Sequence, residues 1–105
     1  MKIYFIYVTF GKVKEAKKIS GLLVNKKLAA CTNIFPSIYS TYVWNNKIQN
    51  DKECSMLVKT SKSKVRKAIQ FIVKYHSYDC PAISTFPIDF SYKDFQKWII
   101  KQTKN

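Results

Sequence analysis

The feature that most constrains the fold is a pair of long extended segments in the middle of the chain. Residues 28–44 and 48–60 are rich in β-branched and aromatic side chains, and turn-forming residues 45–47 join them. We therefore predict one β-hairpin, in which Pro36 indicates either an edge strand or a bulge. An arm of about 16 extended residues spans about 50 Å, whereas a helix of about 14 residues covers only about 21 Å. The hairpin must project from its own domain.

A projecting, aromatic-rich ribbon leaves unpaired backbone groups along its edges. Such edges aggregate unless another chain pairs with them. We therefore expect an obligate homo-oligomer joined through the hairpin edges.

The segments on either side of the hairpin complete an α+β plan. Residues 2–9 are apolar or aromatic on both alternating faces, which predicts a central strand covered on both sides. Residues 13–26 carry apolar side chains at helical spacing. A second amphipathic helix uses Val65, Ala68, Ile69, Ile72 and Val73, and its apolar stripe extends to His76.

Two helix-cap patterns and one further strand complete the predicted order of elements. Ser61 or Ser63 can cap the second helix. Residues 82–88 predict the last strand, and Ser91 with Asp94 forms a capping-box pattern ahead of a short C-terminal helix. The predicted order is β-α-β-β-α-β plus that helix.

Composition limits the number of domains and indicates the cellular compartment. The chain has 105 residues, of which 47% are apolar, so we expect a single domain over residues 1–105. Three cysteines without a CxxC pair indicate free thiols in a cytoplasmic protein. The apolar N-terminal run lacks a cleavage site and reads as a strand, so we expect no signal peptide, and no apolar run reaches the roughly 20 residues of a membrane span.

The charge balance leaves two classes of function open. Lys and Arg outnumber Asp and Glu by 19 to 6, a formal net charge of +13. Lysines covering solvated helix faces explain it most simply, while a basic RNA- or anion-binding module is the alternative. The third strand lacks the aromatic pattern of the RNA-recognition module, so we do not expect nucleic acid as a partner. The chain also lacks a phosphate loop, a nucleophile elbow and an HExxH motif, so we expect no enzyme.

The segment around the only histidine is the main candidate for chemistry. His76 and Cys80 are candidate metal ligands, because imidazole and thiolate suit Cu(I) or Zn. Alternatively, the histidine ring caps carbonyl groups at a helix C-terminus. Cys31 and Cys54 lie among apolar residues and predict core packing. The residues expected to line a cleft or subunit interface are Tyr42, Trp44, Tyr78 and Trp98.

Six motifs occur together in the order and approximate spacing of one family. They are residues 28–34 with Pro36 after them, 42–44, 57–60, 76–81, 86–88 and 92–99. With these motifs the chain resembles the CutA family of divalent-cation tolerance proteins over nearly its whole length.

The resemblance implies a ferredoxin-like fold and a homotrimer in which long hairpins extend the sheets of neighbouring subunits. It also implies a non-enzymatic role in the response to divalent metal ions, with copper or another divalent ion as ligand and no metal required for folding. The copper ligands proposed for bacterial members are one cysteine and two adjacent histidines. The matching positions here are Val8, Tyr75 and His76, so only His76 is retained.

Overall fold

Four strands and three helices follow one another in the predicted order. The computed structural model describes residues 2–105. The elements are β1 (Ile3–Phe10), α1 (Val13–Asn25), β2 (Cys31–Trp44), β3 (Lys47–Ser61), α2 (Val65–Tyr75), β4 (Ile83–Pro87) and α3 (Lys93–Gln102), with a short 3-10 turn, Lys62–Lys64, ahead of α2. The predicted β-α-β-β-α-β plan with a C-terminal helix is confirmed.

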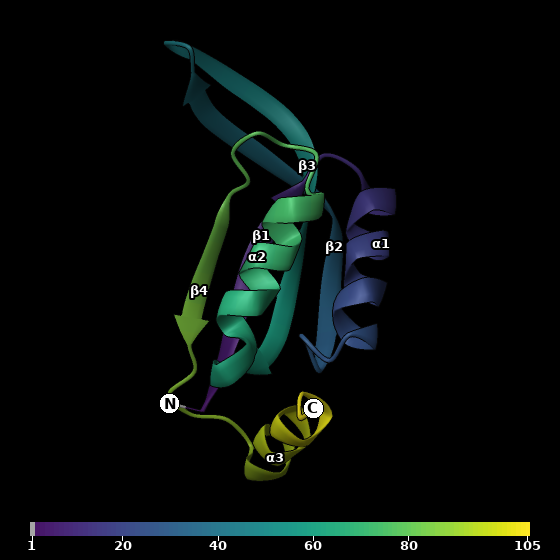
Figure 1. Ribbon diagram of the computed structural model, residues 1–105. Helices are drawn as coiled ribbons and strands as arrows, with labels where there is room; N and C mark the ends of the chain where they lie inside the picture. The colour runs from purple at the N-terminus through teal and green to yellow at the C-terminus, as the bar shows by residue number, and fades with distance from the viewer. Residues whose placement is uncertain (1) are drawn as a thin grey trace.

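The strands form one antiparallel sheet in the order β2-β3-β1-β4. The most apolar strand, β1, lies in the interior of the sheet, as its sequence predicts, and β2 and β4 form the two edges. Helices α1 and α2 cover one face of the sheet, and α3 lies at the end opposite the hairpin (Figure 1). This is the ferredoxin-like α+β arrangement.

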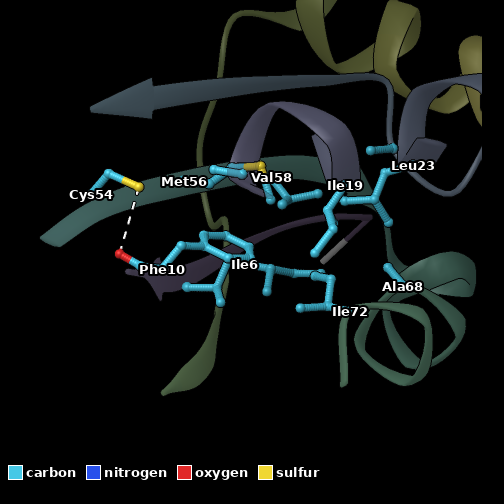
Figure 2. Close-up of a cluster of buried hydrophobic side chains, with 12 residues drawn as sticks. Ile6, Phe10, Ile19, Leu23, Cys54, Met56, Val58, Ala68 and Ile72 are labelled. Atoms are coloured by element: carbon cyan, nitrogen blue, oxygen red, sulfur yellow. Dashed lines mark hydrogen bonds between the residues drawn. The ribbon is translucent and has the colours of Figure 1, made fainter. Parts of the chain in front are cut away.

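The main core lies between the sheet and the two long helices (Figure 2). Alternate residues of β1 point toward the helices, because successive side chains of a strand project to opposite faces. Residues from β1, β3 and both helices fill this layer: Ile6, Val8, Phe10, Ala16, Ile19, Leu23, Cys54, Met56, Val58, Ala68 and Ile72. The helical periodicity of residues 13–26 and of the second helix is therefore confirmed, although Val73 is half exposed.

The other face of the sheet differs from the prediction that β1 is covered on both sides. Helix α3 covers only one end of it, where Ile99 packs with Ile3 and Ala30. Farther along β1, Tyr7 and Thr9 are only partly buried. One chain has too few elements to cover this face, because both long helices lie on the opposite side.

The hairpin projects well beyond the body of the molecule (Figure 1). Its turn consists of Asn45 and Asn46 at φ 52° and 62°, the left-handed conformation that asparagine tolerates and that two-residue hairpins require. The register of β2 against β3 shifts between Phe35 and Ile38, around Pro36. Both alternatives for Pro36 are therefore correct, since it lies at a bulge in an edge strand.

Neither predicted helix cap forms. Ser61 and Ser63 make no cap hydrogen bond, because a 3-10 turn intervenes before α2. Instead, Thr103 Oγ1 donates to Ser61 Oγ at 2.9 Å, which ties the chain end to β3. Helix α3 has Tyr92 at its N-cap, so Ser91 lies one residue too early for a capping box, and its buried hydroxyl has no partner among the described residues.

Within residues 2–105, no helix has the length and apolar character to span a bilayer.

Candidate functional site

A pocket of about 440 Å³ lies where the hairpin leaves the body of the molecule. The end of β1, both strands of the hairpin and the segment between α2 and β4 contribute to its walls. Its lining residues are Thr9, Tyr42, Trp44, Asp51, Glu53, Tyr78, Asp79, Cys80 and Ala82.

Strand register places the hairpin residues of the pocket on one face. Tyr42 and Trp44 are two residues apart on β2, so their side chains share a face. Asp51 pairs with Ser40 and Glu53 with Ile38, which puts both carboxylates on that same face. The Tyr42 hydroxyl donates a hydrogen bond to the Asp51 carboxylate across the two strands.

Tyr78 forms the facing wall and is held by several contacts. Its hydroxyl donates to Glu53 Oε2 at 2.7 Å, and its backbone N–H donates to His76 Nδ1 at 3.0 Å. Its ring centroid lies 4.8 Å from that of His76. Gly11 leaves room for the ring, since a Cβ there would lie 3.2 Å from the Tyr78 hydroxyl oxygen.

His76 lies behind the pocket wall and not in the pocket lining. Its side chain is 9% exposed and stacks on Phe10 at a centroid distance of 4.5 Å and an interplanar angle of 9°. Nε2 lies 2.8 Å from the Thr9 carbonyl oxygen, and Nδ1 accepts from Tyr78. These bonds require the neutral tautomer with the proton on Nε2. Both nitrogens are therefore occupied, and the carbonyl that the ring satisfies belongs to β1, not to a helix.

A carboxylate fastens the segment that follows His76 to the first helix. The Glu15 carboxylate accepts from the Ser77 backbone N–H at 2.7 Å and from the Ser77 hydroxyl at 2.9 Å. Together with His76, these bonds fix the start of the segment that carries Tyr78, Asp79 and Cys80 into the pocket.

The pocket is a concentration of negative charge on a basic chain. Three of the six acidic residues line it, namely Asp51, Glu53 and Asp79. Burial and the hydrogen bond to Glu53 raise the pKa of Tyr78 above its ordinary value. The hydrogen bond to Asp51 raises the pKa of Tyr42. The same carboxylates that oppose a tyrosinate favour a cation.

The structure brings together most of the residues predicted from the sequence. Tyr42, Trp44, Tyr78 and Cys80 all line the pocket. Trp98 does not, because it lies on α3, where its ring stacks on Phe95 at a centroid distance of 6.1 Å.

Sequence reasoning missed the two carboxylates of β3. Asp51 and Glu53 are two residues apart on β3 and lie on the same face of the hairpin as Tyr42, and that i, i+2 spacing is the signal that could have identified them. Of the thiols, Cys54 is buried in the core and donates to the Phe10 carbonyl oxygen at 3.6 Å, as its apolar surroundings predict (Figure 2). Core packing was wrong for Cys31, which is only half-buried and belongs to neither hydrophobic cluster, and Cys80 is exposed.

The described residues do not form a complete metal centre within one chain. No group of three or more His, Cys, Asp or Glu side chains among residues 2–105 is arranged to hold an ion. Val8, at the position of the family cysteine, is fully buried, and Tyr75, at a family histidine position, packs on Phe71. A bacterial-type copper site therefore does not fit these residues.

The chain is similar to proteins of known family over almost its whole length. A family model described as CutA1 divalent ion tolerance protein matches residues 4–102. The divalent-cation tolerance protein CutA of Archaeoglobus fulgidus is 42% identical over 95 residues, which cover 90% of this chain and 92% of that protein. The chloroplastic CutA of Arabidopsis thaliana is 34% identical over 100 residues, and this chain spans only 55% of its length.

Solved structures agree with these matches. The divalent ion tolerance protein CutA1 of Ehrlichia chaffeensis superposes with a TM-score of 0.94 at 38% identity, covering 100% of this chain and 99% of that one. The CutA of Xylella fastidiosa has a TM-score of 0.96 at 30% identity and covers 99% and 100% of the two chains.

Proposed function

Because the chain belongs to the CutA1 divalent ion tolerance protein family, we propose that it takes part in the response to divalent metal ions by binding them, as a homotrimer without catalytic activity. The observation that carries this proposal is the family match over residues 4–102. We further propose that residues 1–105 form one domain. The RNA- or anion-binding alternative gains no support from the comparisons.

The uncovered face of the sheet supports an oligomer. Register places Tyr7, Leu57 and Phe86 on the face opposite α1 and α2. Phe86 is 51% exposed. A sheet face that carries such side chains is stable only when another layer packs on it. A second copy of the chain supplies that layer in our proposal.

The hairpin offers further apolar surface and an unpaired edge. Tyr39, Val43 and Ile48 lie on its face opposite the pocket and are 85%, 66% and 72% exposed. The two free edges of the sheet belong to different strands, β2 and β4. Pairing β2 of one copy with β4 of the next is a head-to-tail contact, which forms a ring when the rotation between copies closes. A three-membered ring of this kind is the assembly that we propose.

Light scattering tests the oligomer directly. We expect the mass of three chains for the wild type. Ile48→Asp should shift the protein toward smaller species, because it places a carboxylate on the apolar hairpin face of every copy, where we propose that neighbouring copies pack. Gln70→Asp is the matched control, since Gln70 is exposed on α2 away from the hairpin. A monomeric wild type would refute the proposal.

For the metal we propose Cys80 and His76 as ligands. The Cys80 thiol is exposed at the pocket, and thiolate and imidazole together suit Cu(I) or Zn. His76 reaches an ion only if its ring leaves Thr9 and Tyr78. Metal sites usually hold three or four protein ligands or keep a water, so the remaining ligands must come from water or from neighbouring copies.

Calorimetric titration with Cu or Zn tests these ligands. His76→Ala and Cys80→Ser should each weaken binding at least several-fold. Cys31→Ser is the control, because that thiol lies on β2 outside the pocket. Absence of binding, or equal affinity in all variants, would reject the assignment.

For location we propose the cytoplasm. The support is that the three cysteines are free. The compartments named for relatives differ, since the Arabidopsis protein is called chloroplastic and the Archaeoglobus structure periplasmic.

A further inference from the structure

The pocket at the base of the hairpin combines aromatic walls with several carboxylates. We propose that it binds a small polyamine-type cation: the ammonium groups interact with Asp51, Glu53 and Asp79, and the alkyl chain lies against Trp44 and Tyr78. The pocket includes Cys80, one of the metal ligands proposed above, but this proposal requires no metal ion.

The size and walls of the pocket suit such a ligand. Its volume of about 440 Å³ is typical of small-molecule pockets, which range from about 300 to 1,000 Å³. Trp44 and Tyr42 are 58% and 41% exposed, although large aromatic side chains are normally buried. Aromatic ring faces attract ammonium groups, and the indole ring of tryptophan does so most strongly.

Two carboxylates of the pocket accept hydrogen bonds from tyrosine hydroxyls and, within residues 2–105, not from cationic side chains. Asp51 and Glu53 accept hydrogen bonds from Tyr42 and Tyr78, which are neutral donors. A neutral hydroxyl holds a carboxylate in place without cancelling its charge. Three negative charges therefore face a single pocket on a chain whose net charge is +13.

The spacing of these charges favours an extended cation over a metal ion. A metal ion requires several ligands that meet at one point, and no such cluster exists within residues 2–105. Asp51 and Glu53 lie on β3, whereas Asp79 lies on the segment between α2 and β4. A chain with two or more ammonium groups can reach carboxylates on both walls at once.

The pocket wall is already ordered for binding. The Tyr78 ring is held by its hydrogen bond to Glu53, its backbone bond to His76 and the close packing at Gly11. A wall held in its bound position reduces the entropic cost of association. His76 thus acts here as a positioning residue for Tyr78.

Spermidine is the probe for this proposal. Calorimetry on the full chain, with a metal chelator and at fixed ionic strength, should show saturable binding. Glu53→Gln retains an acceptor for Tyr78 and removes one charge, and Trp44→Ala removes one wall; each should weaken binding on the order of tenfold. Asp89→Asn removes the same charge outside the pocket and should leave affinity unchanged.

NMR spectra of the unmodified chain provide a second measurement that does not depend on how the variants fold. Spermidine should shift the Trp44 indole and Tyr78 ring signals, while the uncharged 1,8-octanediol should not. No saturable binding, equal affinity in Glu53→Gln and Asp89→Asn, or shifts confined to other residues would overturn the proposal. The chelator removes metal ions from the spermidine experiment. A failed copper or zinc titration therefore does not refute spermidine binding, and a failed spermidine titration does not refute metal binding.

Discussion

Replacement of His76 by alanine tests whether this residue is a structural element of the fold in the absence of any metal. The ring is 9% exposed and makes one hydrogen bond to the Thr9 carbonyl and one to the Tyr78 N–H. Leaving the partly buried Thr9 carbonyl without this partner costs up to about 1–3 kcal/mol. Loss of the stacking on Phe10 adds about 0.5–1.5 kcal/mol. The Tyr78 N–H can regain a water partner, because that residue is exposed.

The sum predicts that His76→Ala lowers the free energy of unfolding by about 3 kcal/mol per chain. Guanidinium denaturation followed by circular dichroism measures the change, at one protein concentration because oligomer stability depends on concentration. A chelator must be present, so that no bound metal contributes. Gln70→Ala, at an exposed position of α2, should change stability by less than about 0.5 kcal/mol. A loss below about 1 kcal/mol for His76→Ala would refute the structural role.

Two further predictions concern a titrating group and an unsatisfied one. Burial and Glu53 raise the pKa of Tyr78, so the folded state holds this proton more tightly than the unfolded chain. The resulting stabilisation is present below about pH 10 and is lost as the pH rises further. In denaturation series from pH 9 to 11, the free energy of unfolding should therefore fall less for Tyr78→Phe than for the wild type. Ser91→Ala removes a buried hydroxyl that has no partner within residues 2–105. Thermal unfolding should therefore show unchanged or higher stability, by up to about 1 kcal/mol, whereas a clear decrease would reveal a missed hydrogen bond.

Patterns that depend on repetition along the chain predicted the fold well. The two amphipathic helices, the central strand and the projecting hairpin all follow from side-chain periodicity, because burial on one face selects the same period over many residues. The caps at Ser61 and Ser91 were wrong, since a cap depends on the residue at which a helix begins. A shift of one residue at Tyr92 is enough to leave Ser91 without a role.

The sequence by itself determined the order of the elements, the hairpin and the family, because each rests on a pattern spread over many residues. Only the tertiary structure decided what the segment around His76 does. The ring nitrogens are occupied by Thr9, which is 67 residues away, and by Tyr78. The pocket likewise depends on the register between β2 and β3, which places Asp51 within reach of Tyr42. Contacts between distant segments are set by packing, and no pattern in the local sequence predicts them.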